Sequence, residues 1–257
     1  MKARHLFLLF IFISFFDVAF TQNKTISSGL IPVLAWGGVP PQETSVERYK
    51  EMKEAGILYN LTRSTSLDSM KWMLDMAQKA GIKLIVRCPE LKTNPEETVR
   101  EFMNHPAVEG YFIYDEPSRV AFTELAKWVK RIQTVDKDRN CYINLLPNYA
   151  FQQQWGTKTY RKYVHNFIRE VPVPFLSFDN YPILRNDDGR YLRENWYENL
   201  EIISKEARIS NKPFWAFALT VSHGNYPIPT LSELRLQIYS NLAYGAQGIQ
   251  YFTYWTP

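Results

Sequence analysis

Two short segments of the 257-residue chain carry carboxylates where they could do acid–base chemistry. Asp115 and Glu116 stand between an apolar run and Pro117, and Asp179 stands between a second apolar run and Pro182. Successive residues of a strand point to opposite faces, so we expect one carboxyl of the first pair, that of Glu116, to face inward. A carboxylic acid that gives a proton and a carboxylate that attacks carbon or activates water can together hydrolyse a glycosidic bond.

Each of these carboxylates also has a simpler interpretation. Glu116 could be a solvated residue near the start of the following helix, where negative charge is favourable. Asp179 and Asn180 could simply form a turn, which both residue types favour. The distance between the carboxyls distinguishes the chemical roles, because retaining glycosidases hold them about 5–5.5 Å apart and inverting ones about 6.5–9.5 Å.

Aromatic and polar residues that follow other predicted strands could complete a carbohydrate site. Flat rings suit the apolar faces of sugars, although core packing explains any single ring equally well. Amide, guanidinium, carboxyl and imidazole groups could bind sugar hydroxyls. The predicted substrate-binding residues are Asp115, Trp36, Arg63, Asn144, Asn148, Tyr181, His223 and Trp255.

An alternation of strands and helices positions these residues. Runs rich in β-branched and aromatic residues alternate with stretches whose apolar residues recur at helical spacing. The predicted strands are 31–36, 57–61, 83–87, 110–114, 142–146, 175–178, 214–219 and 248–254, and the helices are 45–54, 67–80, 95–103, 120–135, 159–170, 192–207 and 231–243. Eight strands, the first seven each followed by a helix, indicate an α/β protein with a (β/α)8 TIM barrel, whose active site lies at the C-terminal strand ends.

The two ends of the sequence fall outside this alternation. Basic residues precede the apolar run 6–16, and small residues precede Gln22, which indicates a signal peptide at 1–21. The run is shorter than the roughly 20 residues of a membrane span, so an uncleaved anchor is the weaker alternative. We expect a secreted or periplasmic protein with no stable membrane span after cleavage.

The remaining segment, 22–257, is expected to be one barrel domain that lacks its last helix. The sequence stops just after the eighth predicted strand, which suggests a truncated barrel and a missing C-terminal region. Such a barrel would leave the outer apolar face of its last strand partly bare.

Composition limits the partners and cofactors. The chain is 46% apolar and 22% charged, which is typical of a packed globular protein. Its 30 basic and 26 acidic residues give a net charge of +4 without a basic block, so we expect no nucleic-acid partner. No zinc-ligand spacing is present, and we expect no cofactor and no metal.

Two cysteines and one polar segment are expected to have structural roles only. Cys88 and Cys141 fall at opposite ends of their predicted strands, too far apart for a disulfide, so both are expected to be buried free thiols. The polar segment 186–189 lacks the spacing and the bidentate Glu of a calcium loop, and is expected to be a solvated turn.

Two segments resemble parts of the (β/α)8-barrel glycoside hydrolases. The sequence GYFIYDEP at 110–117 is similar to the fourth-strand segment in which Asn-Glu-Pro carries the general acid/base. The stretch 235–255 resembles the last helix–strand unit of β-galactosidase-like barrels, which ends in a Trp that stacks on substrate. This resemblance implies a barrel fold, an acid/base role for Glu116 and a sugar-platform role for Trp255.

The sequence departs from that family at two positions. Asp115 stands where the family has an Asn that contacts the sugar 2-hydroxyl. The strand 214–219 is followed by Thr-Val-Ser-His at 220–223, without the Glu that is the family's nucleophile. Asp179 is therefore our first choice for the second carboxylate.

Three hypotheses follow. The first is an exported glycoside hydrolase that acts on a poly- or oligosaccharide, with Glu116 as acid and Asp179 as nucleophile or base; the charge of Asp115 would raise the pKa of Glu116. The second is a carbohydrate-binding barrel that does not cleave, because the strand-seven Glu is absent. The third is a metal-assisted hydrolase in which Asp115, Glu116, Asp179 and His223 surround a divalent ion.

Overall fold

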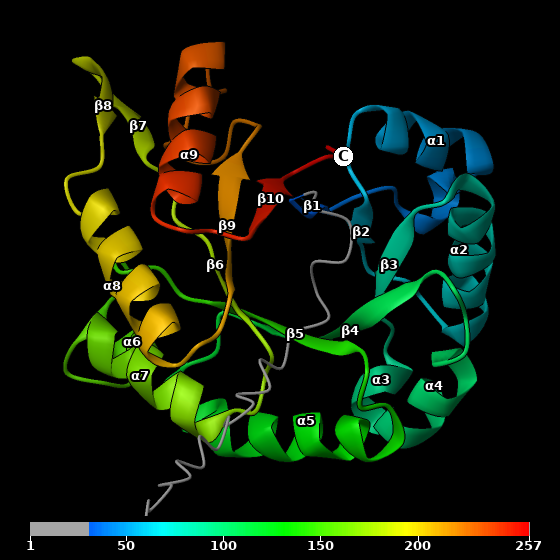
Figure 1. Cartoon of the computed structure of the whole chain (residues 1–257). Helices are drawn as coiled ribbons and strands as arrows, with labels where there is room; N and C mark the ends of the chain where they lie inside the picture. Colours follow the sequence, from blue (N-terminus) through cyan, green and yellow to red (C-terminus); the bar gives the residue numbers. More distant parts are fainter. Residues whose placement is uncertain (1–30, 257) are drawn as a thin grey trace, which may run out of the picture. The chain divides into compact units, whose positions relative to one another are not determined.

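A closed barrel of eight parallel strands organises the chain (Figure 1). The computed structural model describes residues 31–256, so the predicted signal peptide lies outside the described residues. The strands follow one another around the barrel in the order β1-β10-β9-β6-β5-β4-β3-β2, and the pairing of Val33 with Ile249 closes it. The barrel strands are β1 (Val33–Trp36), β2 (Tyr59–Leu61), β3 (Lys83–Val86), β4 (Val108–Asp115), β5 (Asn140–Leu145), β6 (Leu176–Phe178), β9 (Phe214–Leu219) and β10 (Gly248–Phe252). The predicted (β/α)8 fold is confirmed.

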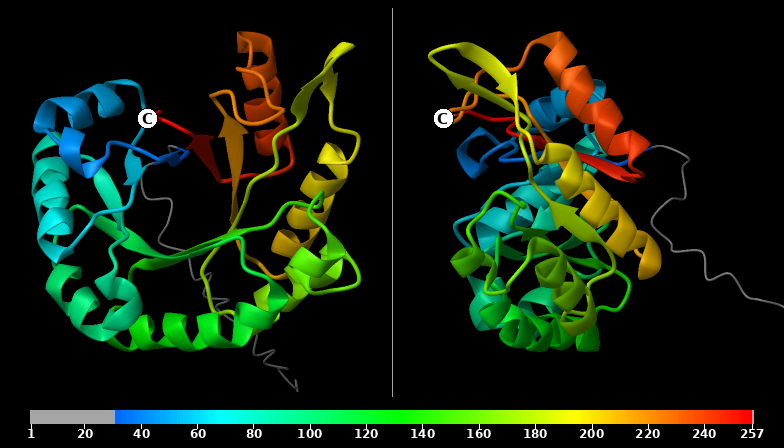
Figure 2. Two further views of the ribbon diagram at one scale, coloured as in Figure 1. Left: turned by 180° about the vertical axis from the view of Figure 1, so that it is seen from behind. Right: turned by 90° about the vertical axis from the view of Figure 1, so that its left-hand side faces the viewer.

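Helices surround the barrel and connect its strands (Figures 1 and 2). Serine or threonine side chains cap the long helices α1, α2, α7 and α9 by accepting a backbone N–H of the first turn, which explains where these helices begin. The helices are η1 (Pro41–Glu43), α1 (Val46–Glu54), α2 (Leu67–Ala80), α3 (Glu90–Thr93), α4 (Pro95–Phe102), η2 (Arg119–Ala121), α5 (Phe122–Val135), α6 (Gln152–Trp155), α7 (Tyr160–Glu170), α8 (Trp196–Ile209) and α9 (Leu231–Ala243).

The main difference from the sequence-based prediction lies after β6. The segment after β6 forms an antiparallel hairpin of β7 (Ile183–Asn186) and β8 (Gly189–Leu192), so the next helix begins at Trp196 instead of residue 192. The predicted polar turn is the tip of this hairpin, where the side chain of Asn186 accepts the backbone N–H of Asp188 at 3.1 Å. The hairpin was hidden because its exposed residues give no core-facing alternation.

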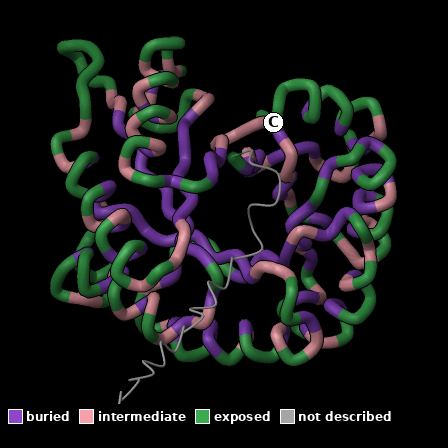
Figure 3. The backbone as a smooth tube through the Cα atoms, in the orientation of Figure 1, coloured by how far each residue is buried: buried purple, intermediate pink, exposed green. Residues whose placement is uncertain are grey.

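The core has an inner and an outer layer. Large side chains fill the barrel interior, among them Trp36, Phe112, Tyr142, Phe175, Trp215 and Phe217. The outer layer lies between strands and helices, and Figure 3 shows the buried backbone running along the barrel strands with exposed turns outside. Cys88 and Cys141 are buried and unpaired, as predicted.

The helix α9 packs unusually lightly. Its buried residues are Gln237 and Asn241, while Leu231 and Tyr239 are 63% and 66% exposed. The Gln237 side-chain oxygen accepts the backbone N–H of Leu219 at 2.8 Å, so a polar contact attaches the helix to β9. Within residues 31–256, no helix is long and apolar enough to cross a membrane.

Candidate active site

The fourth barrel strand carries Asp115 and Glu116 to the C-terminal rim. β4 pairs with β5, and Asp115 at its end lies opposite Asn144. Glu116 has a φ of 49° and donates its backbone N–H to the carbonyl oxygen of Asn144 at 2.8 Å. Positive φ is uncommon outside glycine and costs on the order of 1–3 kcal/mol, and such strain clusters at functional sites. The chain therefore turns sharply at the residue for which chemistry was predicted.

Strand β6 places Asp179 beside Glu116. Asp179 follows the last residue of β6 and is 8% exposed. Its carboxyl lies beside that of Glu116 in one pocket, and the charge of Glu116 adds to burial in raising the pKa of Asp179. The two carboxyls that the sequence singled out meet, although β5 separates their strands in the barrel.

The surroundings of these acids favour their protonated forms. Burial raises the pKa of Asp179 well above its ordinary value, and the charge of Glu116 adds to this effect. Burial and the charge of Asp115 together raise the pKa of Glu116. Burial also raises the pKa of Asp115, but a hydrogen bond from Asn144 and the positive charge of Arg87 oppose that shift. Clustered acids with shifted pKa values are typical of catalytic sites.

A network of buried polar side chains on the barrel strands orients the acids. The side-chain amide of Asn144 donates to Asp115 at 3.2 Å and to Asp179 at 2.8 Å. Its oxygen accepts the hydroxyl of Ser177 at 2.9 Å, and Ser177 in turn accepts the amide of Gln250 at 2.9 Å. Because Asn144 must present oxygen to Ser177, its NH2 group faces the carboxyls. The predicted site residue Asn144 thus holds two acids in place.

A cation that sequence reasoning did not select lies next to this network. The guanidinium of Arg87 sits 4.2 Å from the ring centroid of Phe112 and 5.9 Å from that of Trp36, within cation–π range. Its charge stabilises ionised Asp115. Arg87 directly follows β3, but it was missed because the predicted strand 83–87 included it. Arg63, which was selected after β2, is exposed instead.

A pocket of about 200 Å³ opens at this rim of the barrel. Seven of the predicted site residues line it, so β1, β4, β5, β6 and the loop after β9 all contribute. Two phenylalanines, at the middle of β9 and the end of β10, complete the wall. The lining residues are Trp36, Asp115, Glu116, Asn144, Asp179, Tyr181, Phe217, His223 and Phe252.

The aromatic wall belongs partly to the core. Trp36 is 9% exposed, and its ring packs edge-to-face on Phe112 and Phe217 with centroids 5.6 and 5.5 Å apart. Tyr181 lies 5.9 Å from Phe252 on the same wall. These rings are fixed by their neighbours, so they present rigid apolar edges to whatever occupies the pocket.

Three of the predicted site residues lie outside the pocket lining. Arg63 is exposed after β2. Asn148 is buried and donates to the carbonyl oxygen of Asn195 at 2.8 Å, which ties its loop to α8. Trp255 donates its backbone N–H to Gly37 at 2.8 Å, and Arg48 lies 5.6 Å from its ring centroid, so it sits beside α1.

A second group of residues that was not selected from sequence joins three loops near the pocket. The guanidinium of Arg193, just after β8, stacks 3.8 Å from the ring centroid of Tyr149 and donates to the hydroxyl of Tyr226 at 2.7 Å. Tyr226 also packs edge-to-face on Tyr181, with centroids 5.4 Å apart. The hairpin that positions Arg193 had no signal in the sequence, which explains why this group was missed.

The third hypothesis requires that Asp115, Glu116, Asp179 and His223, which all line this pocket, surround a divalent ion. Among residues 31–256, no group of three or more His, Cys, Asp or Glu side chains is arranged to hold a metal ion.

Comparisons with known proteins extend the fold assignment. No family model matches the sequence, and no curated protein matches it. A hyperthermophilic endo-β-1,4-glucanase in complex with substrate superposes with a TM-score of 0.57 at 14% identity, over 88% of this chain and 89% of that chain. An endo-β-1,3-glucanase from Sorangium cellulosum gives a TM-score of 0.55 at 14% identity, over 89% of each chain.

A third solved structure shows that structural similarity at this level does not determine the activity. The HpcH/HpaI aldolase from Desulfitobacterium hafniense superposes with a TM-score of 0.57 at 12% identity, over 88% of this chain and 87% of that chain. Hydrolases and an aldolase are thus equally similar to this chain. The comparisons establish the (β/α)8 fold, and the activity must be argued from the site.

Proposed function

We propose that the protein is a glycoside hydrolase that acts on a poly- or oligosaccharide at the pocket on the C-terminal rim, with Glu116 as the general acid. The observation that carries this proposal is the cluster of three acids with raised pKa values in one pocket beside aromatic side chains. A general acid must hold a proton near neutral pH, and burial with a neighbouring charge achieves this for a carboxyl.

The role of Asp179 in this proposal follows from its place beside Glu116 in the pocket. It is the second carboxylate, and the nucleophile or base role expected of it requires that substrate lies between the two carboxyls.

Asp115 is the carboxylate of the pocket best placed to stay ionised. It lines the pocket, and both Asn144 and Arg87 favour its ionised form. We propose that it stabilises positive charge that develops on the sugar ring, as a negative charge fixed in position by these two neighbours. The pocket of about 200 Å³ is smaller than the roughly 300–1,000 Å³ of sites for drug-sized ligands. It suits the reacting ring of a saccharide rather than a whole oligosaccharide.

One observation supports a second candidate, a carbohydrate-binding barrel without hydrolysis. β9 ends without a carboxylate, and Thr220 after it uses its hydroxyl to bind the carbonyl oxygen of Thr253 at 3.0 Å. The place of the nucleophile in the resembling family is therefore occupied by a structural contact. This candidate predicts glycan affinity without turnover.

A panel of aryl glycosides and of soluble β-1,4-glucan, β-1,3-glucan and glycol chitin tests the proposal. The wild-type protein should release aryl alcohol or reducing ends from at least one member, and Glu116→Gln should lower that rate by about 10²–10⁴-fold. Glu101→Gln, an exposed change on α4, is the matched control and should keep the wild-type rate. Binding with no turnover across the panel would favour the second candidate.

A further inference from the structure

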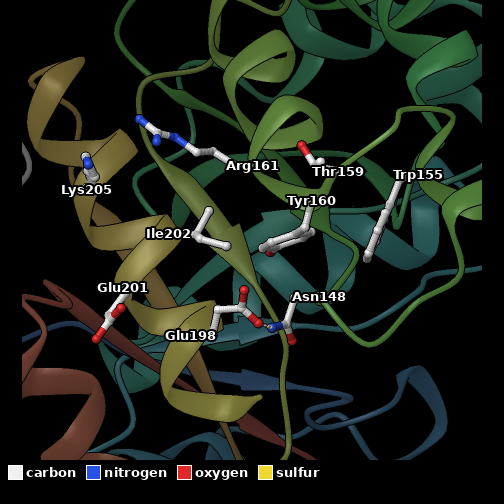
Figure 4. Close-up of a pocket in the computed structure, with 9 residues that line it drawn as sticks. All are labelled: Asn148, Trp155, Thr159, Tyr160, Arg161, Glu198, Glu201, Ile202 and Lys205. Atoms are coloured by element: carbon white, nitrogen blue, oxygen red, sulfur yellow. Dashed lines mark hydrogen bonds between the residues drawn. The ribbon is translucent and has the colours of Figure 1, made fainter.

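A second, larger pocket lies at the edge of the same barrel face. Its volume is about 630 Å³, and it is formed by the loop after β5, the short helix α6 and the first turns of α7 and α8 (Figure 4). That volume falls within the range of pockets that hold drug-sized ligands. None of its lining residues lines the pocket that contains Glu116.

The floor of this second pocket is aromatic and apolar. Figure 4 shows the rings of Trp155 and Tyr160 and the side chain of Ile202 around one space. The indole N–H of Trp155 donates to the carbonyl oxygen of Pro147 at 3.0 Å, and the hydroxyl of Tyr160 accepts the amide of Asn199 at 3.3 Å. These bonds satisfy the polar ends of both rings inside the protein. Because Tyr160 is only 4% exposed, the partly exposed ring of Trp155 is the apolar surface left to bind a ligand.

The rim carries charges of both signs. Glu198, Glu201 and Lys205 come from α8, and Arg161 comes from α7. The guanidinium of Arg161 is already bound at 2.8 Å to Glu206, which is 3% exposed. One lysine therefore faces two carboxylates, and the rim has no excess of positive charge that would select an anion.

A flat apolar floor and a polar rim fit a neutral ligand with apolar faces and many hydroxyls. A sugar ring has this form, because its C–H faces stack on aromatic rings and its hydroxyls bind carboxylates and amides. A hydrocarbon would leave the charged rim groups without partners, which is costly when they are covered. The pocket chemistry therefore favours a neutral saccharide.

The second pocket is also connected to the acids by a short buried path. The amide of Asn180, the residue after Asp179, donates to the side-chain oxygen of Asn148 at 3.1 Å. Asn148 lines the second pocket and lies close to Glu198, to which its amide donates at 3.4 Å. A chain of side-chain hydrogen bonds thus runs from the residue next to Asp179 to the second pocket.

We propose that this pocket between α7 and α8 is a second saccharide-binding site, which holds a neutral glycan segment against Trp155 while the catalytic pocket is occupied by another part of the substrate. The inference takes its ligand class partly from the proposed function, but binding at this site does not require that the protein cleaves glycans.

Affinity gel electrophoresis in the three soluble polysaccharides named above tests the site. At least one polysaccharide should retard the wild-type protein, and Trp155→Ala should weaken that retardation roughly tenfold, the effect of losing one aromatic stacking contact with its buried area. Trp72→Ala is the matched control, because Trp72 lies on α2 and is 52% exposed. It should be retarded as strongly as the wild type.

A second variant guards against misfolding of Trp155→Ala. Glu201 is exposed on α8, so Glu201→Ala should fold normally and should weaken retardation severalfold. Thermal unfolding of each variant checks the fold. Equal retardation of the wild type and Glu201→Ala, or of the wild type and a folded Trp155→Ala, would overturn the inference, as would the absence of retardation in all three polysaccharides.

Hydrolysis measured in parallel separates this inference from the proposed function. Turnover of an aryl glycoside without Trp155-dependent retardation would leave the hydrolase proposal intact and remove the second site. Trp155-dependent retardation without turnover of any substrate would support the second site and contradict the hydrolase proposal.

Discussion

At the scale of single residues, the account depends on how three acids share their protons. Asp115, Glu116 and Asp179 line one pocket, and desolvation by the surrounding protein raises the pKa of each above its ordinary value. Two predictions follow from these pKa directions.

The variant Asp115→Asn should shift the alkaline limb of the rate–pH profile to lower pH. The charge of Asp115 raises the pKa of Glu116, so its removal lowers that pKa. A general acid loses activity as pH rises through its pKa, and the limb therefore moves with it. Measurement of kcat/KM from pH 4 to 9 checks this. An alkaline limb that stays in place would show that Asp115 does not act on the titrating acid.

The variant Asp179→Asn should stabilise the fold at neutral pH. An acid whose native pKa is raised binds more protons when folded than when unfolded. Its contribution to stability is therefore present below its unfolded pKa of about 3.8 and is lost as pH rises toward the native value. Thermal unfolding at pH 4 and pH 8 should show a smaller difference for the variant. A lower melting temperature than wild type at pH 8 would contradict the expected direction.

At the scale of elements, strands β4, β5, β6 and β10 support the site through buried contacts. Gly110 allows the close approach of β4 to β5, because a Cβ at this position would lie 2.4 Å from the backbone oxygen of Asn140. The same strand ends at Asp115, so its placement sets the position of the acids.

We predict that Gly110→Ala destabilises the protein by about 1–3 kcal/mol, since the new methyl group must push two strands apart. Chemical denaturation measures the loss. If the free energy of unfolding changes by less than about 0.5 kcal/mol, the strands are not packed as closely as described.

The sequence predicted those site residues whose position is determined by the C-terminal end of a strand. The acids, Asn144, Trp36, Tyr181 and His223 follow apolar runs, and the C-terminal ends of parallel strands meet at one rim. Arg87 was missed because the predicted strand 83–87 extended one residue beyond the end of β3. Asn148 and Arg193 could not be assigned this way, because their roles depend on how long loops pack against α8 and Tyr149.

At the scale of the whole molecule, hydrophobic patterning was sufficient to predict the barrel. Helices α2 and α9 have the predicted bounds, and a serine or threonine side chain caps the start of each. The β7–β8 hairpin was not predicted, because it is exposed and its residues contribute nothing to the core pattern. Hydrophobic patterns in the sequence thus predicted the elements that form the core, but not the exposed hairpin.

The barrel also predicts that both thiols are inert. Burial raises the pKa of Cys88 to about 11 and that of Cys141 to about 12, so neither forms a thiolate readily near neutral pH. We predict that Ellman's reagent labels neither thiol in the folded protein at pH 8 and labels both in denaturant. Rapid labelling of the native protein would mean that the barrel opens locally at β3 or β5.

The most direct test of the account is the dependence of the Glu116→Gln rate on the leaving group. If Glu116 donates the proton to the glycosidic oxygen, the loss of rate should be large for aryl glycosides with poor leaving groups and small for those with strongly acidic ones, since these leave without protonation. The account predicts this gradient, measured as kcat/KM over a series of aryl glycosides. An equal loss at every leaving group, or no loss at all, would contradict the role of Glu116 as the general acid.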